Sequence, residues 1–416
     1  MAPNTTFRTS AVERFLRYVT FDTQSTETSE TYPSTAKQLD LLRHLADELR
    51  ALGLQDVEMD QYGYVMATIP ATTSKKDVPV IGFIAHVDTS HEMSGAGVKP
   101  IVYRDYQGQD LVLPDDPTAV LRPDDIPYLR ERIGDDIITA SGTTLLGADN
   151  KAGVAEIVTA AEYLVAHPDI PHGPIKIAFT PDEEVGRGTQ HFDVAAFGAT
   201  YAYTMDGSAR GELEYESFSA DAMTLTFVGF NTHPGYAKDR LINAIKVAAD
   251  FIGHLPREMS PEATDGYDGF VHPYVLQGGT ERANVRFIVR DFKTAALKEK
   301  EDMLERLAVA AASRYGARVE VLIEEQYRNM REVLDRHPHV VEYAREAIRR
   351  AGMTVRERSI RGGTDGSKLS FMGLPTPNIF AGEHNFHSRL EWVSVQDMEK
   401  AVEVIVNLAA IWNERA

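Results

Sequence analysis

Three short apolar runs in the first half of the chain each end in acidic or histidine residues. They read "VPVIGFIAHVD", "IKIAFTPDEE" and "TYAYTMDG", and a helical pattern, "GADNKAGVAEIVTAAEYLVAH", lies between the first two. Strands rich in Val, Ile and Phe that alternate with helices indicate a mostly parallel, doubly wound sheet with helices on both faces. In such α/β sheets, sites form at the carboxyl ends of strands. His86, Glu183 and Asp206 all fall at such ends.

The pattern changes near Gly211, which predicts a second domain. "ELEYESFSADAMTLTFVGF" alternates polar and apolar residues like an antiparallel strand pair. Helices over 238–254 and 294–315 then alternate with the strand-like runs "ANVRFIVRDF" and "ARVEVLIEEQ". Because 416 residues exceed one compact core, we expect a discontinuous α/β domain over 1–212 and 326–416. The segment 213–325 would be a smaller inserted α+β domain.

Composition excludes several classes of partner and site. The net charge of −19 argues against nucleic acid, because a phosphate-binding surface needs a basic excess. With no cysteine in the chain, thiolate nucleophiles, disulfides and Cys-ligated zinc are excluded, so a metal must bind His, Asp or Glu. Charges interrupt every long apolar stretch, so we expect no membrane partner and a cytoplasmic location.

The acidic and histidine residues at strand ends make a set suited to metal chemistry, namely His86, Asp88, Asp149, Glu183, Glu184, Asp206 and His387. Two histidines and three carboxylates suffice for a two-metal site with one bridging carboxylate. In such sites the metals lie ~3.5–4 Å apart, lower the pKa of a bound water and polarise the scissile carbonyl.

The neighbouring carboxylates Glu183 and Glu184 are expected to point in opposite directions on an extended chain. One would bind metal, and the other would take the proton that the attacking water loses. Asp88 follows His86 by two residues on the same face of a strand. It would therefore accept the second ring N–H of that histidine and fix its tautomer.

Several motifs in order along the chain carry a family resemblance: "HVDTS", "GADNKAG", "TPDEEVG", "MDG", "THPGYAKDRLINA", "RFIVRDF" and "RGGTDGSKLSFMGLPTPN". Together they resemble the peptidase T family of tripeptide aminopeptidases, which are co-catalytic zinc exopeptidases like carboxypeptidase G and the aminoacylases. The resemblance runs essentially end to end.

The resemblance implies a role for each matching residue. One metal would be bound by His86, Asp149 and Asp206, and the other by Asp149, Glu184 and His387, so that Asp149 bridges the two. Glu183 would be the general base and Asp88 the catalytic partner of His86. The cofactors would be two Zn²⁺ ions per subunit, with cobalt or manganese as alternatives. A cis peptide between Asp149 and Asn150 is also implied.

Two positions depart from the family pattern. Residue 150 is Asn, where the family more often has a second Asp, and position 390 is Leu, where a second histidine often stands. His384 therefore competes with His387 as the C-terminal ligand, and the motif alignment favours His387.

In the inserted domain the resemblance implies a lid that dimerises and contacts substrate through His233, Asn243, Arg290 and Arg361. Three of these have a plainer interpretation: His233 as a turn residue, Arg290 as a structural partner of Asp291, and the segment "RGGTDG", which begins at Arg361, as a glycine turn. The predicted function is the release of the N-terminal residue from tripeptides by a water activated between two metals. Alternatives are a related dipeptidase, carboxypeptidase or N-acyl-amino-acid amidohydrolase, or a catalytically silent peptide-binding homologue.

Overall fold

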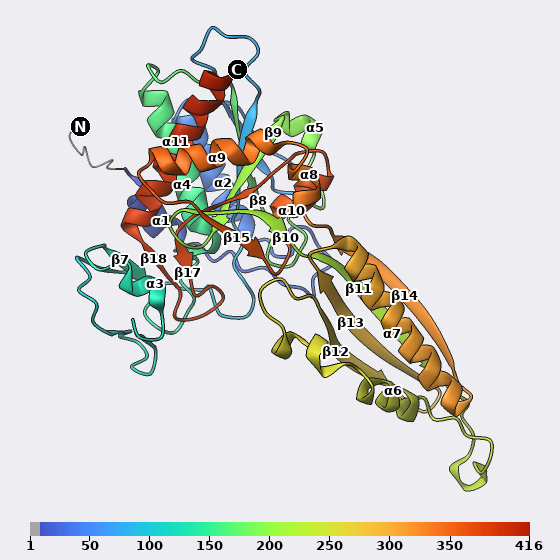
Figure 1. Cartoon of the computed structure of the whole chain (residues 1–416). Helices are drawn as coiled ribbons and strands as arrows, with labels where there is room; N and C mark the ends of the chain where they lie inside the picture. Colours follow the sequence, from blue (N-terminus) through green and yellow to red (C-terminus); the bar gives the residue numbers. More distant parts are fainter. Residues whose placement is uncertain (1–8) are drawn as a thin grey trace. The chain divides into compact units, whose positions relative to one another are not determined.

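The computed structural model describes residues 9–416, which form two compact units (Figure 1). The first contains the chain up to Tyr215 together with Glu332–Arg358 and Thr364–Ala416, and the second contains Glu216–Arg331 and Ser359–Gly363. The first eight residues of the predicted 1–212 segment lie outside the described part. The boundaries differ from the predicted ones: residues 213–215 group with the first unit, and residues 326–331 and 359–363 group with the second.

An eight-stranded sheet forms the centre of the first unit. Its order is β1 (Gln55–Met59), β2 (Val65–Ile69), β8 (Ile175–Thr180), β3 (Ile81–His86), β9 (Tyr201–Gly207), β16 (Asn378–Phe380), β10 (Glu212–Ser217) and β15 (Arg356–Ile360). The four strands β8, β3, β9 and β16 run parallel, whereas β1, β2 and β10 pair antiparallel at the edges. The predicted α/β fold is confirmed, with its parallel part at the centre of the sheet.

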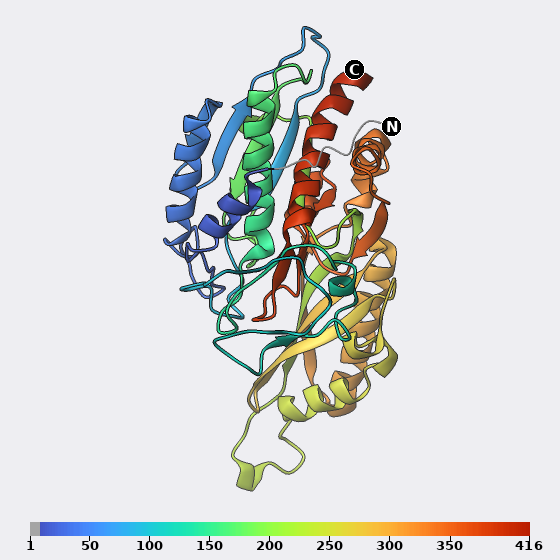
Figure 2. The same ribbon diagram turned by 90° about the vertical axis from the view of Figure 1, so that its left-hand side faces the viewer.

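Helices cover both faces of this sheet, which explains why every residue of β3 is buried. On one face α4 (Ala148–Ala166) packs on β3 and β9, and α1 (Ala11–Tyr18) and α11 (Val395–Arg415) pack on α4. Figure 2 shows α4 in green and α11 in red running alongside each other. Residues of the short helices α5 (Val194–Phe197) and α10 (Asp365–Phe371) form a cluster with Ile84 of β3 and Ala178 of β8. The remaining long helices are α2 (Gln38–Ala51), which contacts β1 and β2, and α9 (Pro338–Arg350), which packs on α11.

A second, four-stranded sheet in this unit carries the C-terminal motif. Its antiparallel order is β17 (Glu383–His384), β18 (Trp392–Ser394), β7 (Ile137–Thr139) and β4 (Ile101–Tyr103). Trp392 is fully buried in the apolar cluster beside it. The Pro-rich loop contains the pair β5 (Leu111–Val112) and β6 (Val120–Leu121) and the turn α3 (Pro127–Arg130), and α8 (Arg331–Leu334) precedes α9.

The second unit is one antiparallel sheet with two helices packed on it. The strand order is β12 (Phe270–Gly278), β13 (Arg282–Asp291), β11 (Ser219–Val228) and β14 (Arg318–Tyr327). The helices α6 (Ala244–Gly253) and α7 (Thr294–Tyr315) share its apolar core. The 3₁₀ turns η1 (Pro234–Tyr236), η2 (Arg257–Met259) and η3 (Pro261–Ala263) complete it.

Two predictions for this region are wrong in detail. The strands β10 and β11 do not pair with each other, because a single residue, Phe218, separates them and leaves no room for a hairpin turn. The helix expected over 238–254 begins at Ala244, since Asn243 caps it by accepting the backbone N–H of Ile245 at 3.0 Å. Within residues 9–416, no helix is both long and apolar enough to cross a lipid bilayer.

Candidate metal centre

The sheet order brings the three strand-end motifs together. Because β3 lies between β8 and β9 and all three are parallel, their carboxyl ends meet at one edge. His86 is the last residue of β3, Asp206 lies near the end of β9, and the glutamate pair follows β8. Asp149 reaches the same place from the first turn of α4, which packs on β3 and β9.

The buried side chain of His86 contacts three aspartates. Its Nε2 lies 3.0 Å from Oδ1 of Asp149 and 3.4 Å from Oδ1 of Asp206. Its Nδ1 lies 3.1 Å from the backbone carbonyl oxygen of Asp88 and 3.3 Å from Oδ1 of the same residue, whose side chain is completely buried. A histidine held through Nδ1 presents Nε2 in a fixed direction, as in ligands whose second nitrogen is hydrogen-bonded to a carboxylate.

His387, in the loop between β17 and β18, shows the same arrangement. Its Nε2 lies 2.8 Å from Oε2 of Glu184 and 3.4 Å from Oδ2 of Asp149, while Nδ1 lies 3.1 Å from Oε2 of Glu92. Asp149 therefore offers one oxygen to each histidine. The competing His384 instead stacks on Trp392, with ring centroids 4.1 Å apart. It is His387, not His384, that the structure brings to the carboxylates.

The glutamate pair lies in a turn, not on an extended strand as predicted. Strand β8 ends at Thr180, and the carbonyl of Glu183 accepts the N–H of Gly186 at 2.7 Å. The backbone N–H groups of Glu183 and Glu184 both donate to the carboxylate of Asp88, at 3.0 and 3.2 Å. Asp88 thus holds both the ring of His86 and the turn that carries the two glutamates, a second task that the sequence did not suggest.

Burial and mutual repulsion disfavour ionisation of Glu183, Glu184 and Asp206. At Asp149 burial acts in the same direction, but hydrogen bonds from His387 and His86 outweigh it and lower the pKa of that carboxyl. Burial raises the pKa of Glu183 well above its usual value, and the negative charges of Asp365 and Asp206 add to the effect. Burial, with the charge of Asp149, raises the pKa of Glu184 to about 8. The pKa of Asp206 is raised for the same reason, mainly burial. This much negative charge in one place calls for a compensating cation.

The histidines compensate part of that charge as protonated groups. Hydrogen bonds to Asp149 and Glu184 raise the pKa of His387 to about 11. Burial would lower the pKa of His86, but the surrounding aspartates outweigh it and hold that pKa well above its usual value. Metal binding releases such protons, because ligating histidines must be neutral. A divalent cation bound here would take over the charge compensation that protonated histidines provide.

The donor atoms fit a pair of metal ions. Ligand atoms of His86, Asp149 and Glu184 lie within 4.8 Å of one another, and so do those of Asp149, Asp206 and Glu383. The two groups share Asp149. Oε1 of Glu184 is buried without a hydrogen-bond partner. Nitrogen and carboxylate donors of this kind suit Zn²⁺, Co²⁺ and Mn²⁺.

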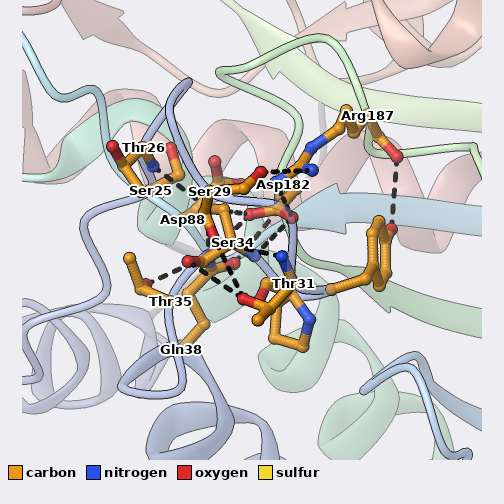
Figure 3. A network of polar contacts seen from close by, with 12 residues as sticks. Ser25, Thr26, Ser29, Thr31, Ser34, Thr35, Gln38, Asp88, Asp182 and Arg187 are labelled. Carbon is orange, nitrogen blue, oxygen red and sulfur yellow. Dashed lines mark hydrogen bonds and ion pairs between the residues drawn. The ribbon is translucent and has the colours of Figure 1, made fainter.

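Asp182 anchors the turn that carries the glutamate pair (Figure 3). This fully buried residue, at a left-handed φ of 61°, accepts the backbone N–H of Ser34 at 2.6 Å and Nε2 of Gln38 at 2.7 Å. It also accepts the hydroxyl of Ser34 and pairs with Arg187 at 3.2 Å. The backbone N–H of Asp182 in turn donates to Oε1 of Gln38 at 3.1 Å.

We expect Asp182→Ala to lower the free energy of unfolding by about 3–5 kcal/mol. The substitution leaves the buried donors of Ser34 and Gln38, and the charge of Arg187, without their partner. Denaturant unfolding monitored by circular dichroism measures this loss. Asp193→Ala is a suitable control, since Asp193 caps α5 by accepting the N–H of Ala196 at 2.9 Å near the surface. Its removal should cost about 1 kcal/mol. Equal losses from the two variants would contradict the anchoring role of Asp182.

Glu391 is a further residue at the centre that the sequence analysis missed. Its buried carboxylate accepts the backbone N–H groups of Leu146, Gly147 and Asp149 at 2.7, 2.8 and 2.9 Å. It thereby fixes the loop that enters α4, where the expected cis peptide between Asp149 and Asn150 is present. The available signal was the position of Glu391, four residues after His387 and directly before the strand β18.

The predicted substrate-binding residues all lie in the second unit. His233 accepts the N–H of Gly235 in turn η1, and Asn243 caps α6. Nη1 of Arg290 donates to the carbonyl of Arg361 at 3.1 Å. The guanidinium of Arg361 donates to carbonyl oxygens of the loop 264–268. Asp291, the alternative partner of Arg290, pairs with Lys300 instead.

Comparison with known proteins finds a matching family model, and relatives that match nearly the whole chain. The sequence model of Peptidase family M20/M25/M40 matches residues 123–410. A peptidase T from Geobacillus thermodenitrificans is 50% identical over 405 residues, covering 97% of this chain and 98% of the relative. A peptidase T from an Exiguobacterium species is 49% identical over 406 residues, with 97% and 98% covered.

Solved structures share the fold. The aminopeptidase PepT from Bacillus cereus superimposes with a TM-score of 0.75 at 22% identity, covering 97% of this chain and 98% of that one. A dinuclear metal-binding peptidase of the M20 family from Bacillus subtilis gives 0.68 at 17% identity, with 99% and 100% covered. The family resemblance predicted from the motifs is confirmed, and the chain belongs to peptidase family M20/M25/M40, among relatives named peptidase T.

Proposed function

We propose that the chain is a two-metal aminopeptidase that releases the N-terminal residue from tripeptides. The observation that carries the proposal is the sharing of Asp149 between two histidine–carboxylate groups, with Glu183 beside them. The substrate class follows from the relatives named peptidase T, which match nearly the whole chain at about half of all positions.

The ligand assignment rests on the contacts of the two histidines. His86 and Asp206 would hold one cation and His387 and Glu184 the other, with Asp149 giving one oxygen to each. Two divalent cations would supply a Lewis acid for the scissile carbonyl and lower the pKa of the attacking water. Asp88 would keep Nε2 of His86 directed at its cation by occupying Nδ1.

Glu183 is proposed as the general base. It belongs to neither ligand group, yet the charges of His86 and Asp206 act on it directly. A carboxylate with a raised pKa beside the reacting water accepts its proton readily and later returns it to the leaving amine. Because Asp88 accepts the N–H groups of both glutamates, the backbone from which the two side chains extend is held in place.

The second unit is proposed as the lid that contacts substrate, through His233, Asn243, Arg290 and Arg361. The planar guanidinium of Arg290 suits a peptide carboxylate, although its Nη1 also donates to the carbonyl of Arg361. Arg361 and Asn243 likewise make hydrogen bonds that stabilise their own unit. Zn²⁺ as the native metal, a homodimer through the lid and a cytoplasmic location are also proposed. Elemental analysis of the isolated protein, light scattering and cell fractionation test these three proposals.

A chelator-controlled peptide series tests the function. We expect rapid release of the N-terminal residue from a free tripeptide, weak activity on a dipeptide and a tetrapeptide, and none on an N-acetylated tripeptide. Removal of metal by a chelator should abolish turnover, and added Zn²⁺, Co²⁺ or Mn²⁺ should restore it, because hydrolysis needs the activated water. Amino acid release is measured by chromatography.

Other outcomes would identify the alternatives. Hydrolysis of the acetylated peptide would indicate an N-acyl-amino-acid amidohydrolase, and release of the C-terminal residue would indicate a carboxypeptidase. A preference for the dipeptide would indicate a dipeptidase. If the chain binds two metals but cleaves no peptide, it is a silent peptide-binding homologue.

A further inference from the structure

Glu383 is a buried carboxylate beside the metal centre to which neither the motifs nor the proposed mechanism gives a task. It begins β17, where it pairs with Val393 of β18, and only 1% of its surface is exposed. The hydroxyl of Ser208 donates to its backbone carbonyl at 2.9 Å, which fixes the main chain. Its Oε2 is buried and has no hydrogen-bond partner.

The carboxylate of Glu383 reaches the ligands of one of the two cation positions. One of its oxygens lies within 4.8 Å of carboxylate oxygens of both Asp149 and Asp206. These are the two aspartates that Nε2 of His86 contacts at 3.0 and 3.4 Å. Glu383 and His86 therefore approach the same two aspartates, whereas His387 faces Glu184 and Asp149.

The surroundings give Glu383 little other compensation. The two groups that its oxygen approaches, Asp149 and Asp206, are carboxylates as well. A buried carboxylate without a hydrogen bond is costly, so a group of this kind calls for a partner. A cation between Asp149 and Asp206 would supply one.

We propose that Glu383 is a fourth donor at the cation position of His86, Asp149 and Asp206, which makes the two metal positions chemically unequal. The inference rests on the proposed ligand assignment. One position has a nitrogen donor and three carboxylates, and the other has a nitrogen donor and two carboxylates. Because oxygen-rich donor sets favour harder ions, the His86 position should accept Mn²⁺ more readily, relative to Zn²⁺, than the His387 position does.

The test measures metal binding, not catalysis. Wild-type chain and Glu383→Gln are freed of metal and equilibrated with buffered free Zn²⁺ or Mn²⁺, and bound metal is counted by mass spectrometry. We expect Glu383→Gln to bind one cation normally and the other at least about 10-fold more weakly, because it loses a negatively charged donor but keeps its shape. The ratio of Mn²⁺ to Zn²⁺ affinity at the weakened position should also fall.

Glu156→Gln is the matched control. Glu156 lies in α4, is fully buried, and has two carboxylate oxygens without hydrogen-bond partners, but it belongs to neither ligand group. Its variant should bind both cations as the wild type does. A loss equal to that of Glu383→Gln would show a general effect of buried charge and would overturn the proposal.

Two further results would overturn it. If Glu383→Gln binds both cations with wild-type affinity while Glu383→Ala binds them weakly, the side chain supports the aspartates as a hydrogen-bond donor and is no ligand. If stepwise Mn²⁺ competition in the zinc-loaded wild type finds equal positions, the proposal fails even without a folded variant. Neither result depends on turnover. If the chain cleaves no peptide but shows the expected metal binding in both experiments, the proposed function is wrong and Glu383 is still a ligand.

Discussion

Replacement of Glu183 by Gln is expected to lower kcat on a tripeptide by about 10²–10⁴-fold and to leave the metal content unchanged. The amide has the same shape as the carboxylate but cannot take the proton of the attacking water. KM should change little, because the interaction is needed mainly in the transition state. Steady-state kinetics and elemental analysis of the same preparation measure both quantities.

Glu184→Gln is the control for this prediction, because the two residues are adjacent and both N–H groups donate to Asp88. Its side chain lies 2.8 Å from Nε2 of His387, so its loss should weaken one metal position and lower activity through the metal. The assignment of the pair is reversed if Glu183→Gln loses metal and keeps its activity while Glu184→Gln does the opposite.

Replacement of Asp149 by Asn is expected to remove both cations and, with them, all measurable turnover. Asp149 places one oxygen 3.0 Å from His86 and the other 3.4 Å from His387, so a single substitution takes a donor from each position. Mutation of groups that merely orient a ligand costs roughly 10–100-fold in metal affinity, and the loss of a bridging ligand should exceed that. Titration with Zn²⁺ against a competing chromophoric chelator measures the affinity.

Asp206→Asn is the matched control, since Asp206 contacts His86 but not His387. It should weaken one position and leave the other near wild type. The Asp149→Asn variant should keep the fold, because Glu391 holds the loop before α4 through backbone N–H groups that the substitution leaves in place. An Asp149→Asn protein that still binds two cations tightly would disprove the bridge.

The sequence predicts the central fold well because burial leaves a local signature. The runs that became β3 and β8 read as strands covered on both faces, and both are flanked by strands and helices in the structure. Helix α7 begins and ends at the predicted residues, Thr294 and Tyr315. The pairing of β10 with β11 was wrong, because alternation identifies a strand but does not identify its neighbour.

At the site, too, the local sequence predicts some features correctly and others wrongly. Local order in the sequence places His86, Glu183 and Asp206 at strand ends, and the parallel topology alone then brings them to one edge. The opposed directions of Glu183 and Glu184 were inferred from strand geometry, which does not apply, since the pair lies in a turn held by Asp88.

The sequence by itself determined the family, the parallel core and the types of donor atom available for metal, because apolar periodicity and short motifs are local properties. The tertiary structure decided between His384 and His387, and it revealed the support of the Asp149 backbone by Glu391, 242 residues away. It also brought Glu383 to Asp149 and Asp206. Contacts over such separations depend on where loops close after the sheets have formed, and no local pattern records that.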